Sequence, residues 1–144
     1  FKYANKRISI IDAPGYADFT GEMLSSLNAA DSAVLLVAAN DGIQVGTEKT
    51  WSMASELGLA GAIFINKLDK ENVNFYGVVD SIKERFGKHC VLVNMPIGTG
   101  PGFKGVIDLL SVGDRHACPL HYIFCQDSVR RGLLKIFRAW CLQV

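Results

Sequence analysis

Long apolar runs, paired cysteine motifs and an excess of charge of one sign are all lacking in this chain of 144 residues. No window of 18 apolar residues occurs, so no segment predicts a membrane-spanning helix and no membrane partner is expected. The four cysteines include no C-x-x-C pair, which argues against a zinc ribbon and against a disulfide framework. The chain begins with Phe1 and carries no readable targeting segment. We therefore expect a soluble protein of a reducing compartment, the cytoplasm.

Apolar residues make up 49% of the chain, which is enough for one domain with one sizeable core. The net charge of +1 neither favours nor excludes a nucleic-acid partner, but the charge is unevenly distributed. Residues 1–110 carry 10 Lys+Arg against 12 Asp+Glu, whereas residues 111–144 carry 5 against 2 and three of the four cysteines. We expect a body over residues 1–112 and a divergent basic tail over residues 113–144.

In the body, short apolar runs alternate with helical patterns, which is typical of an α/β fold with a parallel sheet. The strands are expected at residues 7–11, 33–39, 61–65, 91–93 and 104–109, with a Gly/Pro-rich loop at 98–102. A first helix is expected at residues 19–29. A second is expected to begin at the cap Thr47 and to stop at Gly58, with Trp51, Ala54 and Leu57 on its inner face. A third is expected after the cap Asn74, with an apolar stripe of Phe75, Val78, Val79, Ile82 and Phe86.

A polar turn, Asp12-Ala13-Pro14-Gly15, follows the first expected strand. Asp, Pro and Gly all favour turns, so this segment is consistent with an ordinary strand-terminating turn. It is equally consistent with a phosphate and Mg²⁺ sensor, because a carboxylate at a strand tip can hold Mg²⁺ and Gly15 allows a close approach of its backbone N–H to a phosphate. The residues alone leave both interpretations open.

A second polar turn, Asn66-Lys67-Leu68-Asp69, follows the third expected strand. One Asp carboxylate can accept both the ring N–H and the exocyclic amine of guanine, whereas adenine presents an acceptor at the ring position. Asn66 can hold the loop together, and the Lys67 stem can lie along the ring face. An ordinary charged loop is the alternative, but this pattern directly after a buried strand favours guanine recognition. Because ligands bind at the carboxyl ends of parallel strands, both turns are expected at one sheet edge.

Residues 8–110 resemble the GTPase domain of translational GTPases, most closely that of elongation factor G or an elongation-factor-G-like protein. The stretches that carry the resemblance are Ile10-Ile11-Asp12-Ala13-Pro14-Gly15-Tyr16-Ala17-Asp18-Phe19-Thr20, Asp41-Gly42-Ile43-Gln44-Val45-Gly46-Thr47-Glu48 and Phe64-Ile65-Asn66-Lys67-Leu68-Asp69-Lys70. Residues 103–110 look like the start of the subdomain that elongation factor G inserts here. The resemblance implies a P-loop NTPase-type (Ras-like) parallel sheet with flanking helices.

The resemblance also implies cofactors, partners and residue roles. It implies binding of GTP or GDP with Mg²⁺, and the ribosome as the partner of the full-length protein. The implied roles are Mg²⁺ and γ-phosphate for Asp12 and Gly15, guanine for Asn66, Lys67 and Asp69, and the water-orienting position for Tyr16. The implied function is GTP hydrolysis that drives ribosomal translocation.

Two departures from the family pattern affect catalysis. Tyr16 stands where the family usually has His, and a phenol with a pKa of ~10 cannot position or deprotonate water as an imidazole does. A divergent elongation-factor-G-like subgroup also has Tyr at this position. No G-x-x-x-x-G-K-[ST] motif occurs in the chain, so the loop that cradles phosphates and the first strands are missing. A non-hydrolysing ribosome- or partner-interaction module, or a ribosomal-protection-type paralogue, is therefore the alternative function.

The missing strand has a structural consequence. In the family's sheet order, the strand before the phosphate loop lies between those matching residues 7–12 and 33–39. Without it, two apolar strands have unpaired edges, which costs stability and favours aggregation. Because the phosphate loop is absent as well, we expect the isolated chain to bind guanine nucleotides very weakly.

The tail contains two further patterns. His116, Cys118, His121 and Cys125 match no common zinc spacing, so no zinc is expected. The second pattern is an apolar stripe at helical spacing, formed by Leu133, Ile136, Phe137, Trp140 and Cys141. The opposite side of this expected helix carries Arg130, Arg131, Lys135 and Arg138. A basic amphipathic helix of this kind lies on a membrane or in a partner groove, whereas a simple packing helix or a frame-shifted terminus would give the same pattern by chance.

Overall fold

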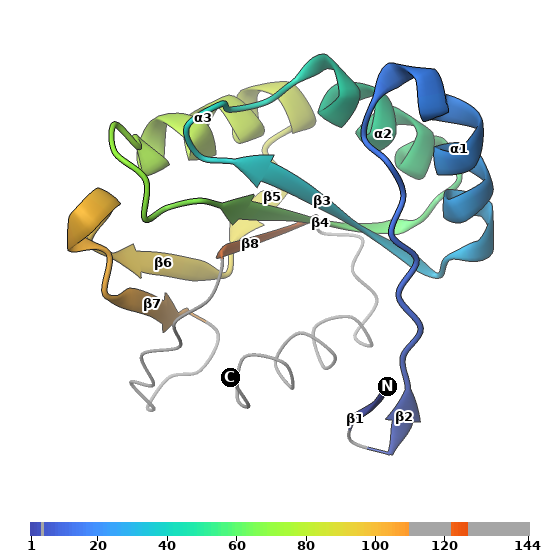
Figure 1. Ribbon diagram of the computed structural model, residues 1–144, viewed down its shortest axis with the longest axis horizontal. Helices are drawn as coiled ribbons and strands as arrows, with labels where there is room; N and C mark the ends of the chain where they lie inside the picture. The colour runs from blue at the N-terminus through green and yellow to red at the C-terminus, as the bar shows by residue number, and fades with distance from the viewer. Residues whose placement is uncertain (4, 110–121, 127–144) are drawn as a thin grey trace.

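Three helices lie along one face of a four-stranded sheet in the computed structural model, which describes residues 1–3, 5–109 and 122–126 (Figure 1). The helices are α1 (Thr20–Ala29), α2 (Val45–Glu56) and α3 (Phe75–Phe86). The sheet has the order β3 (Ser32–Ala38), β4 (Ala60–Asn66), β8 (Tyr122–Gln126) and β5 (Cys90–Leu92). This arrangement confirms the expected fold class, an incomplete Ras-like α/β fold.

The pair β3 and β4 is parallel, with Leu35 opposite Ile63 and Val37 opposite Ile65. These four side chains are at most 5% exposed and face the helices. The intervening residues point to the other face, where Val34 and Leu36 are 44% and 64% exposed. The sheet is not parallel throughout, because β8 pairs antiparallel with both β4 and β5.

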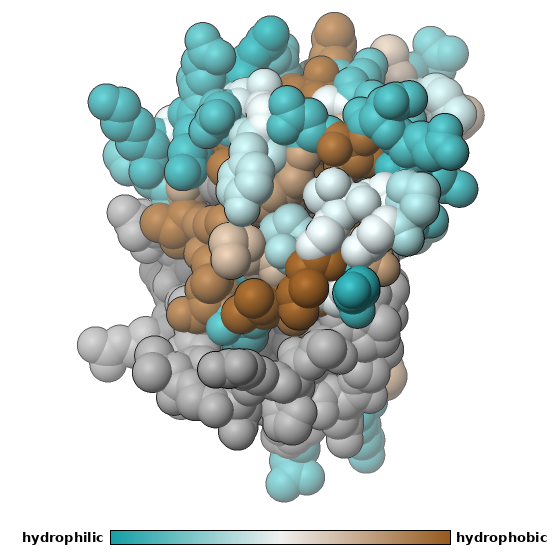
Figure 2. All heavy atoms as spheres, turned by 90° about the vertical axis from the view of Figure 1, so that its left-hand side faces the viewer, coloured by the Kyte–Doolittle hydropathy of each residue, from teal (hydrophilic) through white to brown (hydrophobic). Residues whose placement is uncertain are grey.

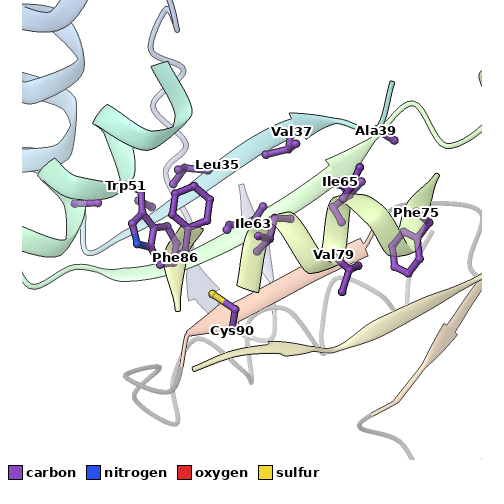
Figure 3. Close-up of a cluster of buried hydrophobic side chains, with 14 of the residues drawn as sticks. Leu35, Val37, Ala39, Trp51, Ile63, Ile65, Phe75, Val79, Phe86 and Cys90 are labelled. Carbon is purple, nitrogen blue, oxygen red and sulfur yellow. The ribbon is translucent and has the colours of Figure 1, made fainter. Parts of the chain in front are cut away.

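The helix α3 follows its sequence pattern closely. The Asn74 side chain accepts a hydrogen bond from the Gly77 backbone N–H at 3.0 Å, so it caps the helix as expected. All five residues of the expected apolar stripe are buried. Figure 3 shows Phe86 of this stripe beside Trp51 of α2, and their ring centroids are 4.9 Å apart.

A separate antiparallel pair, β6 (Asn94–Ile97) and β7 (Gly105–Asp108), follows β5 at one end of the molecule. The loop between them contains a 3₁₀ turn, η2 (Gly100–Gly102). Figure 2 looks at this end and shows apolar side chains gathered below a polar helical surface. Ile107 and Leu109 are among the apolar residues exposed here, at 39% and 43%. The sequence pattern predicted β7 but missed β6.

The expected strand at residues 7–11 is not formed. β2 (Lys6–Arg7) pairs only with β1 (Lys2–Tyr3), residues 8–16 have no regular structure, and η1 (Ala17–Phe19) then leads into α1. Ile10 and Ile11 are 76% and 51% exposed. Ile8 still exchanges backbone hydrogen bonds with Phe1 at the end of the β1–β2 pair. Residues 9–11 keep the apolar pattern, but no described strand lies beside them, and a strand needs a neighbour that pairs with its backbone groups.

Two details of α2 also differ from the expectation. Gln44, not Thr47, is the N-cap residue, and the helix therefore begins two residues before the position at which Thr47 was expected to cap it. Leu57 is 41% exposed and does not belong to the inner face, because it follows the last helical residue. Trp51 and Ala54 are buried as expected.

The expectations for the tail concern residues outside the described ranges, apart from the backbone of Cys125 on β8. They therefore remain predictions. Among the described residues, no helix is long and apolar enough to cross a membrane.

Candidate nucleotide-binding site

Two polar loops meet where β3 and β4 end. The backbone N–H of Ala39 donates to the carbonyl of Asn66 at 2.8 Å, so the carboxyl ends of the two strands lie side by side. After β3, the carbonyl of Ala38 accepts the backbone N–H groups of Asp41 and Gly42, which closes a tight turn. The second loop is the turn over residues 66–70, which follows β4 at the edge where parallel sheets bind ligands.

The turn over residues 66–70 starts with an unusual backbone conformation. Lys67 has a φ of 61°, in the left-handed region that costs a non-glycine residue roughly 1–2 kcal/mol. The Asn66 side-chain oxygen accepts the Lys67 backbone N–H at 2.8 Å, and the Lys67 carbonyl accepts the Lys70 N–H at 3.2 Å. These two bonds support the conformation, and the first is the loop-tying role expected of Asn66.

Leu68 fixes the middle of this turn to the core. Its side chain is 4% exposed and belongs to the main hydrophobic cluster. The residues on either side, Lys67 and Asp69, are exposed. Buried Leu68 therefore holds two charged side chains outward at the end of β4.

Asp69 fits the donors of a guanine base. Its carboxylate makes no hydrogen bond or ion pair with any residue in the described ranges, so both oxygens can accept the ring N–H and the exocyclic amine. The Lys67 ammonium likewise has no such partner in the described ranges, and its stem is free to lie along a ring face. The structure thus brings together the three residues expected to contact the base.

The residues expected to contact phosphate and Mg²⁺ lie on a different segment. Asp12, Gly15 and Tyr16 are all exposed, and within the described part of the chain no hydrogen bond or ion pair joins them to the turn over residues 66–70. The expectation that Asp12 shares a strand-end edge with Asn66 is wrong, because the strand that would place it there is not formed.

Part of this segment is nevertheless held against α2. A Cβ atom on Gly46 would lie 3.0 Å from the Gly15 carbonyl, so the two backbones pass very close to each other. Five residues further on, the Thr20 hydroxyl accepts a hydrogen bond from the Lys49 ammonium at 3.0 Å. Gly15 therefore has a fixed position, whereas Asp12 has none of these contacts.

A Mg²⁺ site is not formed by these residues alone. The described residues contain no group of three or more His, Cys, Asp or Glu side chains that could hold a metal ion. A single exposed carboxylate such as Asp12 binds Mg²⁺ firmly only together with phosphate oxygens and other ligands. The described residues therefore do not form a complete metal site, whereas the Asp69 carboxylate offers the two acceptors that the edge of a guanine base requires.

One contact to the turn over residues 66–70 was not predicted from the sequence. The Gly100 backbone N–H donates to the carbonyl of Leu68 at 2.7 Å. The sequence marked residues 98–102 only as a Gly/Pro-rich loop. The three glycines at positions 98, 100 and 102 are the signal that its backbone comes close to other chain segments.

Comparisons with known proteins agree with this fold. Residues 1–133 match the family described as the Elongation factor Tu GTP binding domain. The chain is 38% identical over 109 residues to a protein of Thermotoga maritima named "Elongation factor G-like protein"; the match covers 76% of this chain and 16% of that protein. A crystal structure of a Thermus thermophilus protein matches with a TM-score of 0.62 and 38% identity, over 67% of this chain and 14% of the other.

The fold is that of a P-loop-type nucleotide-binding domain, and the chain belongs to the Elongation factor Tu GTP binding domain family of translational GTPases. Membership of this family implies binding of a guanine nucleotide. The chain spans 16% of the length of the Thermotoga relative and 14% of the solved chain. The expected boundary between a body and a tail at residue 112 remains a prediction.

Proposed function

We propose that this chain supplies the guanine-recognising part of an elongation-factor-G-like GTPase. The observation that carries the proposal is the turn after β4, in which buried Leu68 holds Lys67 and Asp69 outward and the Asp69 carboxylate has no described partner. The full-length protein would hydrolyse GTP to drive ribosomal translocation in the cytoplasm. In this proposal residues 1–112 are the partial GTP-binding domain, and residues 113–144 are a divergent basic tail.

Base selectivity would come from hydrogen-bond matching. The two Asp69 oxygens would accept the ring N–H and the exocyclic amine of guanine. With adenine, one oxygen would face a ring acceptor and remain unpaired, which a site built on hydrogen bonds rejects strongly. Asn66 would keep the turn in shape through its bond to Lys67, and the apolar stem of Lys67 would cover one face of the base.

The phosphate side of the site is not assembled by the described residues. The roles of Asp12 toward Mg²⁺ and of Gly15 toward the terminal phosphate remain predictions that rest on the resemblance. A nucleotide bound to this chain would gain little from phosphate contacts. Its affinity should therefore be very weak, and a fluorescent GTP titration that gave micromolar or tighter binding would contradict this.

A second candidate function rests on Tyr16. This residue occupies the position that usually orients the attacking water, and its side chain is 77% exposed without a described hydrogen bond. A tyrosine is a poor general base at neutral pH. The alternative is therefore a degenerate module that occupies the ribosome or another partner without hydrolysing GTP.

Substitution of Asp69 tests base recognition. Xanthine has a carbonyl where guanine has its exocyclic amine, so Asp69→Asn, which offers a donor, should reverse the preference from guanine to xanthine. Saturation-transfer NMR with GDP and xanthosine diphosphate detects weak binding to the 144-residue chain. Asp80→Asn, on the exposed face of α3, removes the same charge and should leave the preference unchanged. An undiminished guanine preference in Asp69→Asn would refute the proposal.

The two candidate functions differ in turnover. GTP hydrolysis by the full-length product, with and without ribosomes, distinguishes them: the translocase requires ribosome-stimulated phosphate release, and the interaction module requires ribosome binding without it. Tyr16→His should raise the stimulated rate if this position orients water in the parent enzyme. An unchanged rate would show that position 16 does not orient the attacking water.

A further inference from the structure

The turn that carries Asp69 is held from outside the sheet by the loop over residues 98–102. Gly100 lies in this loop and donates its backbone N–H to the Leu68 carbonyl at 2.7 Å, the shortest of the backbone bonds made by either loop. Leu68 thus has two attachments: its side chain is in the core, and its carbonyl is bound by Gly100. Both neighbours of Leu68 in sequence are residues assigned to the base.

Only a glycine fits easily at position 100. Gly100 is buried and has a φ of 60°, where side chains other than glycine are strained. A Cβ atom there would lie 3.4 Å from the Lys70 carbonyl, at the other end of the same turn. The loop is therefore bonded to the turn at Leu68, and a side chain at position 100 would also meet the turn at Lys70.

The loop is itself closed by backbone contacts, so it can act as a support. The Ile97 carbonyl accepts the Lys104 N–H at 2.9 Å, and the Gly100 carbonyl accepts the Phe103 N–H at 3.0 Å. A Cβ atom on Gly98 would come within 2.2 Å of the Gly102 carbonyl, so the two ends of the loop nearly touch. Phe103 packs against the hydrophobic core. These contacts hold the Gly100 N–H in a fixed position toward the Leu68 carbonyl.

We propose that Gly100 is a positioning residue for guanine recognition: its bond to Leu68 fixes the turn in the conformation that points Asp69 at the base. This inference rests on the proposed function, because it concerns the same site. It goes beyond it by assigning a role in base selectivity to a loop well separated from the turn along the chain, which touches no nucleotide in this scheme.

Gly100→Ala tests this role. The strain at a positive φ should shift the loop away from Leu68, and apparent affinity falls with the fraction of molecules in the competent conformation. We expect roughly fivefold or greater weakening of GDP binding and a lower preference for GDP over ADP, both followed by NMR titration of the whole chain. Faster amide hydrogen exchange at position 100 and in residues 66–70 should accompany the loss.

Gly102→Ala is the matched control. Gly102 lies in the same loop, has no positive φ, and a Cβ there would meet no atom within 4 Å. Its GDP affinity and its preference over ADP should stay within about twofold of the unaltered chain. Gly100→Asn should bind GDP more tightly than Gly100→Ala, because Asn adopts left-handed conformations at lower cost. In any of these variants, a general loss of folded protein would lower GDP binding and ADP binding equally.

The results separate this inference from the proposed function. If the unaltered chain prefers GDP and Gly100→Ala keeps the same affinity and preference, Gly100 does not position the turn. Equal weakening by Gly102→Ala would also overturn the inference. If the unaltered chain shows no preference for GDP, the proposed function fails and the role in selectivity fails with it, even where the exchange data still show that Gly100 holds Leu68.

Discussion

The side-chain oxygen of Asn66 accepts the backbone N–H of Lys67, the residue that follows it, at 2.8 Å. Lys67 is one of three non-glycine residues with a positive φ in the described part of the chain. Asn66 is thus the last residue of β4 and also the residue that stabilises the first step of the turn. This short contact joins the sheet to the turn that is proposed to bind the base.

Removal of the Asn66 oxygen should destabilise the protein. Asn66→Ala leaves the Lys67 N–H without its partner in a strained conformation, at a cost of about 1 kcal/mol in the free energy of unfolding. Asn66→Asp keeps an acceptor at the same position and should restore most of this loss. Urea unfolding of both variants measures the effect. Equal losses in the two variants would show that the hydrogen bond is not the cause.

The outer edge of β3 should promote self-association. The N–H of Ala39 points to β4, and the backbone N–H and C=O groups of successive strand residues point to alternate sides. Those of Val34 and Leu36 therefore point away from β4, and no described residue pairs with them. Their exposed apolar side chains add to this edge. We expect the chain to form concentration-dependent oligomers in sedimentation velocity experiments.

A charge at this edge should reduce the association. Leu36→Lys places an ammonium beside the unpaired backbone and should shift the chain toward the monomer. Leu24→Lys is the matched control, because Leu24 is 42% exposed on α1, away from the sheet edge. If both variants reduce association to the same extent, general surface charge is responsible. A chain that stays monomeric at all concentrations would contradict the prediction.

Local patterns were predicted well, because local physics determines them. The Asn74 cap and the buried stripe of α3 depend only on residues within one helix and on its apolar side, and both are confirmed. The strand at residues 7–11 has an equally clear pattern, but its formation requires a neighbouring strand. The resemblance predicts that this neighbour is missing, whereas the apolar pattern alone still predicts a strand.

The candidate site also combines features that the sequence predicted with features that it did not. The types and spacing of Asn66, Lys67 and Asp69 predict contacts to a base, and these roles remain predictions, although the structure shows the turn that carries the three residues. The sequence pattern did not indicate the positive φ of Lys67 or the bond from Gly100 to Leu68. The bond from Gly100 depends on how segments distant in sequence pack together, which no single window of residues contains. The positive φ is local, but a lysine rarely adopts this conformation, so the residue type gives no sign of it.

Truncation of Phe86 should strongly destabilise the core. Phe86 is 9% exposed, ends the stripe of α3 and packs on Trp51 (Figure 3). Phe86→Ala should lower the free energy of unfolding by about 3 kcal/mol, and Phe86→Leu by clearly less. Phe19→Ala removes the same atoms from a residue that is 43% exposed and should cost under about 1 kcal/mol. Urea unfolding followed by circular dichroism measures all three variants.

Cys90 should make stability depend on pH in the alkaline range. The thiol is buried beside Phe86 and Ile63, and burial raises its pKa above the usual range, although the Lys83 charge lowers it in part (Figure 3). The folded state therefore keeps the Cys90 proton to a higher pH than the unfolded state does. This contribution to stability is complete below the pKa of an unfolded thiol, about 8.5, and is lost as the pH rises through the higher folded value.

Comparison with Cys90→Ala isolates this effect. The variant loses stability at every pH because a buried side chain is shortened, but its free energy of unfolding should fall less steeply above pH ~8.5 than that of the unaltered chain. Lys83→Gln removes the charge that lowers the pKa and should make the fall steeper. The other three cysteines are present in all three proteins, so their titration cancels in the comparison. Parallel pH profiles for the unaltered chain and Cys90→Ala would show that the Cys90 thiol does not contribute.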